Sequence, residues 1–179
     1  MGVSQRRVRM VILCEGDMDE RFARRLLESR SVGRHQVRVE KTPRGSGEQF
    51  VRERYPVEVR AYRSQQRENV GLLVLTDADE MTVDQRRRTL DIALEQSGQT
   101  RREAAERIAL MLPKRNMETW VWHLCGNVVD EETEYKPRPL PADGSSAGRG
   151  ALQHLQQAPG DCCPPSLASG REEFTKLGL

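Results

Sequence analysis

RVRMVILCEGDMDERFARRLLESR, residues 7–30, contains the pattern from which the fold can be predicted. Residues 7–14 are mostly β-branched or apolar and end at the dipeptide EG, which is typical of a buried strand followed by a tight turn. In residues 17–30 apolar side chains recur every three or four positions, and Asp17 with Glu20 fits a capping box. A strand, a glycine turn and a helix in this order open an α/β unit.

The same alternation of strands and helices continues along the chain. Further strands are predicted at 36–40, 70–76 and 107–112. A glycine-rich loop is expected at 42–47, and Pro56 is expected to separate two helices. The order predicts an α/β fold with a mostly parallel sheet and helices on both faces. The predicted helices after the first are 48–55, 57–68, a helix capped by Thr82 or Asp84 that runs to 96, and 116–124.

The 179 residues suffice for one domain with its own core. We expect residues 1–126 to form the α/β core and residues 127–179 to form a loop-rich extension packed on the same domain. Residues 130–150 are rich in acids, proline, glycine and serine, which favours a long loop. Short helices are predicted at 151–157 and 165–177, which makes the extension partly helical.

The amino-acid composition indicates a globular protein and argues against some kinds of binding site. Charged residues make up 31% of the chain and the net charge is only +2, which is typical of a globular domain. Aromatic residues make up 4%, which argues against a surface built for base stacking. We expect a cytoplasmic protein with no membrane partner, because the sequence has neither a signal peptide nor a spanning segment. The four cysteines form no CxxC pair, so we expect reduced thiols rather than a zinc site.

Acidic residues follow two of the predicted strands. Glu15 follows the first strand and Asp19 lies one helical turn later, while Asp77 and Asp79 follow the strand at 70–76. Ligands bind at the carboxyl ends of the strands in parallel sheets, and residues two apart on an extended segment point the same way. Clustered carboxylates are typical of a site for one or two Mg²⁺ or Mn²⁺ ions, and such sites carry out phosphoryl chemistry. The alternative is that these acids only cap helices.

These residues resemble a known family. VILCEGDMDERF, residues 11–22, is similar to the Glu-Gly opening of TOPRIM domains, and LLVLTDADE, residues 72–80, is similar to their Asp-x-Asp motif. The resemblance implies a compact sheet flanked by helices. It also implies that Glu15 is a metal ligand or general base and that Asp77 and Asp79 hold Mg²⁺. Asp19 occupies the place of an acid that the two-metal OLD-type members carry.

A second, looser resemblance concerns PKRNMETW, residues 113–120. This segment looks like one in small TOPRIM-like proteins of bacterial genomes, some of which are thought to sit beside ATPase genes in phage-defence loci. The resemblance implies a further metal-binding carboxylate at Glu118, an ATPase partner and a role in phage defence. The chain departs from topoisomerases and primases, because it has no catalytic tyrosine domain and no zinc ribbon.

Basic residues near these motifs are candidates for phosphate contacts. Lys114 follows a predicted strand end, where a cation would stabilise the charge that develops in phosphoryl transfer, so we include it among the catalytic residues. Nucleic-acid contacts are expected from four arginines. A solvated surface is the alternative for each. The four are Arg44 in the glycine-rich loop, Arg86 and Arg87 in a run of three arginines, and Arg115.

The sequence therefore predicts a metal-dependent endonuclease that hydrolyses phosphodiesters, with DNA expected before RNA as the substrate. The first alternative is a non-catalytic or partner-activated nucleic-acid-binding subunit that works with an ATPase. The second is an RNA-processing endonuclease of TOPRIM type. No nucleotide cofactor is expected, because the loop at 42–47 lacks the Gly-Lys-Ser/Thr ending of a phosphate-binding P-loop.

Overall fold

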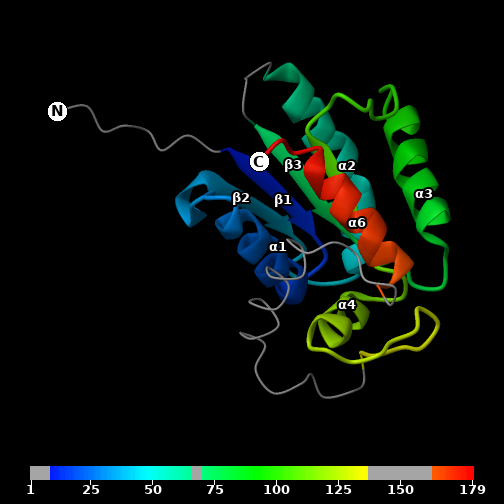
Figure 1. Ribbon diagram of the computed structural model, residues 1–179. Coiled ribbons are helices and arrows are strands. Elements are labelled where there is room, and N and C mark those ends of the chain that lie inside the picture. Colours follow the sequence, from blue (N-terminus) through cyan, green and yellow to red (C-terminus); the bar gives the residue numbers. More distant parts are fainter. Residues whose placement is uncertain (1–8, 66–69, 137–162) are drawn as a thin grey trace.

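The computed structural model describes residues 9–65, 70–136 and 163–179 (Figure 1). At its centre lies a sheet of four parallel strands in the order β2-β1-β3-β4. β1 and β3 are paired so that Cys14 lies beside Leu75, and the residues after these two strands therefore meet at one edge of the sheet. The predicted α/β class and parallel sheet are confirmed. The strands are β1 (Met10–Cys14), β2 (Val37–Lys41), β3 (Gly71–Leu75) and β4 (Ile108–Met111).

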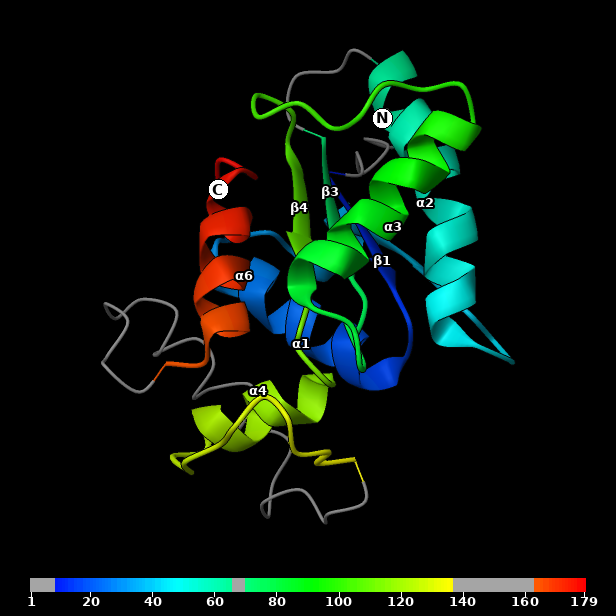
Figure 2. The same ribbon diagram turned by 90° about the vertical axis from the view of Figure 1, so that its right-hand side faces the viewer.

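Helices cover both faces of the sheet (Figures 1 and 2). One face packs against α1 (Asp17–Ser29), α4 (Met117–Leu124) and α6 (Pro165–Thr175). The other packs against α2 (Gly47–Ser64) and α3 (Val83–Gln96). A short 3-10 helix, Arg34–Gln36, leads into β2. None of the described helices combines the length and the apolar character that crossing a lipid bilayer requires.

β1, β3 and β4 are apolar throughout because a core lies against each face of the sheet, whereas the edge strand β2 carries Arg38, Glu40 and Lys41. In β1, Met10 and Ile12 point into the core under α1, α4 and α6, while Val11 and Leu13 point into the core under α2 and α3. All five residues of β1 and of β3 are buried. A strand buried on both faces has no polar position, which is why these segments read as continuous apolar runs in the sequence.

α2 is one helix where the sequence predicted two. Pro56 lies inside it and is buried. A proline removes one helical N–H and crowds the preceding turn, so it normally ends or kinks a helix. Here Val51, Tyr55 and Val59 are completely buried on either side of Pro56, and their packing against the sheet holds both halves of the helix in place.

The C-terminal helix α6 completes the domain. It packs along the edge strand β4, where Glu173 Oε2 accepts a hydrogen bond of 2.9 Å from the backbone N–H of Leu110. Arg102 pairs with Glu173 and donates to the carbonyl of Ile108, so these two side chains satisfy backbone groups that an unpaired edge strand leaves open. Of the two helices predicted after residue 150, α6 is observed, and the one at 151–157 lies outside the described residues.

Candidate functional site

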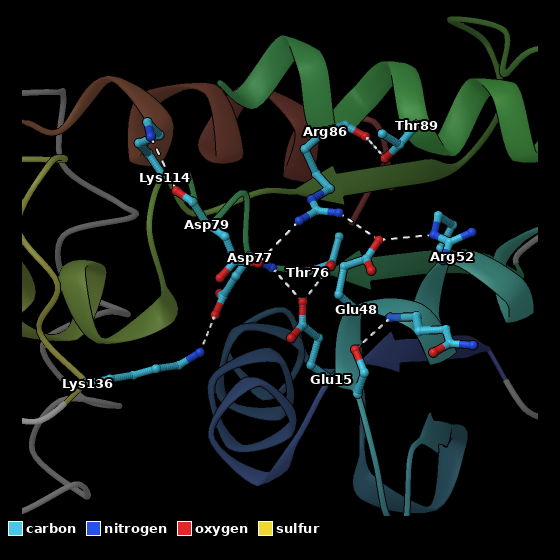
Figure 3. A network of polar contacts seen from close by, with 12 residues as sticks. Glu15, Glu48, Arg52, Thr76, Asp77, Asp79, Arg86, Thr89, Lys114 and Lys136 are labelled. Carbon is cyan, nitrogen blue, oxygen red and sulfur yellow. Dashed lines mark hydrogen bonds and ion pairs between the residues drawn. The ribbon is translucent and has the colours of Figure 1, made fainter. Parts of the chain in front are cut away.

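Glu15 occupies the middle of the acidic cluster, between the end of β1 and the end of β3 (Figure 3). Its Oε1 accepts hydrogen bonds from Thr76 Oγ1 at 2.5 Å and from the backbone N–H of Asp77 at 2.8 Å. Its Oε2 accepts no hydrogen bond from the described residues. Gly47, the first residue of α2, lies so close that a Cβ there would be 2.6 Å from Glu15 Cβ. Glu15 is thus fixed by one oxygen, and its other oxygen lies beside the start of α2, where a Cβ at Gly47 would be 3.0 Å from it.

Asp77 and Asp19 lie beside Glu15 and are both buried. Asp77 is 6% exposed and Asp19 is 7% exposed. Burial, followed by repulsion from Glu15, raises the pKa of Asp77 well above its usual range and raises the pKa of Asp19 to about 7. Glu118 on α4 adds to the repulsion on both aspartates. Four of the five predicted carboxylates, Glu15, Asp19, Asp77 and Glu118, therefore lie close enough to act on one another.

Asp19 also accepts a backbone hydrogen bond at the start of α1. The backbone N–H of Gly16 donates to Asp19 Oδ2 at 3.1 Å, which is one half of a capping box, because Gly16 has no side chain to form the other half. The predicted box of Asp17 with Glu20 is wrong, because both of those carboxylates bind Lys41, each at 2.5 Å. The carboxylate of Asp19 is thus partly occupied by the backbone at the start of α1.

Asp79 does not point the same way as Asp77, contrary to the prediction. Its φ is 54°, a left-handed conformation that reverses the side-chain alternation of an extended segment. Its backbone pairs with Arg115 in an isolated bridge, and its half-exposed carboxylate lies 3.2 Å from Arg86. Asp79 still raises the pKa of Glu15, where burial has the larger effect, so it flanks the cluster on the side of α3.

Lys136 is a site residue that the sequence reasoning missed. Its Nζ lies 3.4 Å from Asp77 Oδ2 (Figure 3). Burial lowers the pKa of Lys136, but Asp77 and then Glu118 raise it by more, so the ammonium stays charged. The preceding residue Tyr135 is buried against Trp122 of α4, with ring centroids 6.1 Å apart, and this contact brings Lys136 to the cluster. Nothing in its acidic, loop-like sequence context indicated such a position.

Arg86 is buried, with 4% of its surface exposed, and the expectation of a nucleic-acid contact there is corrected. Its guanidinium lies between Glu48 Oε1 at 2.7 Å and Asp79 Oδ2 at 3.2 Å. A sequence signal existed, because Arg86 shares helical spacing with Leu90 and Leu94, which are both buried. The run of three arginines therefore does not form one solvated face.

The other predicted basic residues surround the cluster more loosely. Arg44 is exposed in the loop before α2, and Arg87 pairs with Asp84 at 2.7 Å. Arg115 lies 4.0 Å from Glu134. Lys114 Nζ donates to the backbone carbonyl of Asp79 at 3.3 Å, so it supports the loop after β3 instead of facing the carboxylates.

The donor set fits a hard divalent cation in its chemistry. Among residues 9–65, 70–136 and 163–179, no three histidine, cysteine, aspartate or glutamate side chains form a ready-made group around one point. Mg²⁺ keeps several of its waters and is usually held by one or two carboxylates together with phosphate oxygens. Buried carboxylates that repel one another, with one donor-free oxygen at Glu15, suit such an ion. The remaining ligands would then come from water or substrate.

Comparisons with models of protein families, with curated proteins and with solved structures found no match to this chain. The likeness to TOPRIM domains rests on the sequence motifs quoted above, and it remains a prediction.

Proposed function

We propose that this chain is a Mg²⁺- or Mn²⁺-dependent nuclease that hydrolyses phosphodiester bonds at the carboxyl edge of its sheet. The observation that carries the proposal is the burial of Asp77 and Asp19 beside Glu15, where each carboxylate raises the free-energy cost of ionising the next. A fold tolerates such a cost where a bound cation offsets it. The TOPRIM-like motifs at the same residues point to the same chemistry.

Glu15 and Lys136 would have different roles in the proposed reaction. A bound Mg²⁺ would supply a Lewis acid and lower the pKa of water. Glu15, held through Oε1 by Thr76 and the backbone of Asp77, presents Oε2 in a fixed direction. Lys136, next to Asp77, is placed to receive a phosphate oxygen and would have the charge-stabilising role that was predicted for Lys114.

Nucleic acid is the proposed substrate class, with DNA placed before RNA. Arg44 is exposed in the loop before α2, and Arg115, in the segment after β4, pairs with the backbone of Asp79. Two cations of this kind suit backbone phosphates on either side of a scissile bond. Arg87 on α3 pairs with Asp84 and donates to Ser169 of α6, so both contacts must open for a phosphate contact.

The second candidate is a partner-activated subunit. Two observations favour it: Lys136 pairs with Asp77, and no ready-made ligand group exists among the described residues. A partner that moves the segment of Lys136 would free Asp77 for an ion. An ATPase in a phage-defence locus is the partner that the sequence resemblance implies.

A cleavage assay tests the proposal. Supercoiled plasmid, single-stranded DNA and structured RNA are incubated with Mg²⁺ or Mn²⁺ and with wild type, Asp77→Asn, Glu15→Gln or Glu95→Gln. Glu95 is a matched control, because its carboxylate pairs with Arg101 on the surface of α3. We expect both site variants to lose activity at least about 100-fold and the control to keep it.

The outcomes separate the candidates. Cleavage that survives in Asp77→Asn at the wild-type rate rejects the nuclease site. Calorimetric Mn²⁺ binding by wild type without cleavage, followed by cleavage once an ATPase is added, favours the subunit. A preference for structured RNA over both DNA substrates favours the RNA-processing alternative.

A further inference from the structure

Arg86 is a buried cation with two acidic partners on different elements (Figure 3). Its NH1 lies 2.7 Å from Glu48 Oε1, and its NH2 lies 3.2 Å from Asp79 Oδ2. Its Nε is buried and finds no hydrogen-bond partner in the described part of the chain. A buried donor without a partner costs stability.

The two acids that Arg86 binds lie next to the residues of the proposed metal site. Glu48 is in the first turn of α2 and directly follows Gly47, whose backbone is packed against Glu15. Asp79 belongs to the loop that carries Asp77 at the end of β3. Arg86 itself comes from α3, so one guanidinium ties together α2, α3 and the loop after β3.

The backbone conformation of Asp79 is unfavourable and depends on neighbouring contacts. Asp79 is a non-glycine residue with a φ of 54°, a conformation that costs free energy and persists only where the surroundings enforce it. The backbone N–H of Asp79 bonds to the carbonyl of Arg115 at 3.2 Å, and Lys114 donates to its carbonyl. The ion pair with Arg86 is the contact that fixes its side chain.

We propose that Arg86 is a positioning residue: it holds the Asp79 loop and the start of α2 in fixed places on either side of Glu15. The role of those places rests on the proposed metal-dependent function. Arg86 acts through Asp79 and Glu48 and does not touch the substrate. Buried ion pairs contribute little net stability, but they can fix one geometry, which is what a site with dispersed carboxylates needs.

The test compares Arg86→Gln and Arg86→Lys with wild type and with Arg102→Gln. Arg102 is a matched control, because it is also a largely buried arginine, paired with Glu173, but it lies at the amino end of β4, away from the site. Hydrogen exchange is measured in metal-free buffer, and Mn²⁺ affinity is measured by calorimetry.

In Arg86→Gln, residues 77–82 and 46–50 should exchange on the order of 10-fold faster than in wild type, because the ion pairs that hold both segments are gone. Mn²⁺ should bind on the order of 10- to 100-fold more weakly, as is usual when a residue supporting a metal ligand is removed. Arg86→Lys should fall between wild type and Arg86→Gln, since an ammonium cannot form the fork that bridges two carboxylates. Arg102→Gln should change exchange at β4 and α6 instead.

Unchanged exchange of residues 77–82 in Arg86→Gln overturns the proposal, whether or not the protein binds Mn²⁺. So does unchanged Mn²⁺ affinity in that variant, and so does the same local change in Arg102→Gln, which would make the effect one of general stability. Absence of Mn²⁺ binding by wild type rejects the proposed metal function instead, and the exchange data still decide whether Arg86 holds the two segments.

Discussion

At the scale of single residues, the buried carboxylates lower the stability of the folded state. A carboxyl group whose pKa is raised by folding is more easily ionised in the unfolded chain, so its charge at pH 7 favours unfolding. Asp77 is the strongest case, since its pKa is raised well above its usual value first by burial and then by Glu15 and Asp19. The half-exposed Lys136 offsets this only in part, because a partly solvated ion pair contributes little.

Asp77→Asn should therefore stabilise the protein in metal-free buffer. We expect the free energy of unfolding at pH 7 to rise by about 1–2 kcal/mol, because a neutral amide of the same shape removes a buried charge. Urea unfolding followed by tryptophan fluorescence measures the change, with Glu95→Gln as the control that should shift by less than about 0.5 kcal/mol. An Asp77→Asn protein less stable than wild type would show that the carboxylate stabilises the folded state through its ion pair with Lys136.

The acids at the strand ends could be predicted from the sequence, but their directions could not. Glu15 and Asp77 follow apolar runs, and parallel pairing brings such ends together. The orientation of Asp79 depends on a positive φ that no local pattern of non-glycine residues indicates. Lys136 reaches Asp77 through the tertiary contact of Tyr135 with Trp122, and tertiary contacts between distant segments cannot be read from spacing.

The start of α2 packs tightly against Glu15. A Cβ at Gly47 would lie 2.6 Å from Glu15 Cβ and 3.1 Å from Glu15 Cα, so Gly47→Ala must displace the helix or the backbone of Glu15. We expect a loss of about 1–3 kcal/mol of stability, as in other overpacked sites, together with weaker Mn²⁺ binding. Gly16→Ala is the comparison, because a Cβ there meets no atom within 4 Å. Equal losses of Mn²⁺ affinity in both variants would contradict a specific role for the contact.

The stability that Glu173 of α6 contributes should depend on pH. Burial opposes the ionisation of Glu173, but Arg102, Lys176 and the backbone of Leu110 together lower its pKa to about 2. A carboxyl group with a lowered folded pKa stabilises the protein above its unfolded pKa, and this stability is lost as the pH falls toward the folded pKa. Between pH 6 and pH 3, wild type should thus lose about 1–3 kcal/mol relative to Glu173→Gln, measured by urea unfolding at each pH. A difference independent of pH would show that the pKa of Glu173 is the same in the folded and the unfolded chain.

Element order follows well from the sequence, because apolar runs and helical spacing are local signals. β1, β3 and α3 begin and end within a few residues of the predicted bounds. α2 shows where local reasoning fails: the penalty of Pro56 is real, but three completely buried neighbours outweigh it. The cover of the β4 edge by α6 could not be predicted either, since it depends on contacts between segments far apart in the chain.

The whole molecule is held together by its C-terminal part as much as by its α/β core. Ser166 at the start of α6 accepts a hydrogen bond of 2.8 Å from Trp120 of α4, and its backbone N–H donates to Glu131 at 2.9 Å. Gly170 lies so close to Trp120 that a Cβ would be 2.7 Å from the indole ring. Since residues 130–136 also bring Lys136 to Asp77, fold and site depend on the same extension.

A chain that ends at residue 126 should therefore not fold. It loses Leu167, Phe174 and Leu177, which are buried in the core under α1, α4 and α6. Burial of three large apolar side chains contributes about 5–9 kcal/mol, which is comparable with the about 5–15 kcal/mol that a typical domain has in total. The loss also exposes the backbone of β4 that Glu173 covers. Far-UV circular dichroism and a urea titration of the truncated and full chains measure the effect: we expect no cooperative transition without residues 127–179. A truncated chain that unfolds cooperatively near the full-length midpoint would instead make the extension an accessory to an independent α/β core.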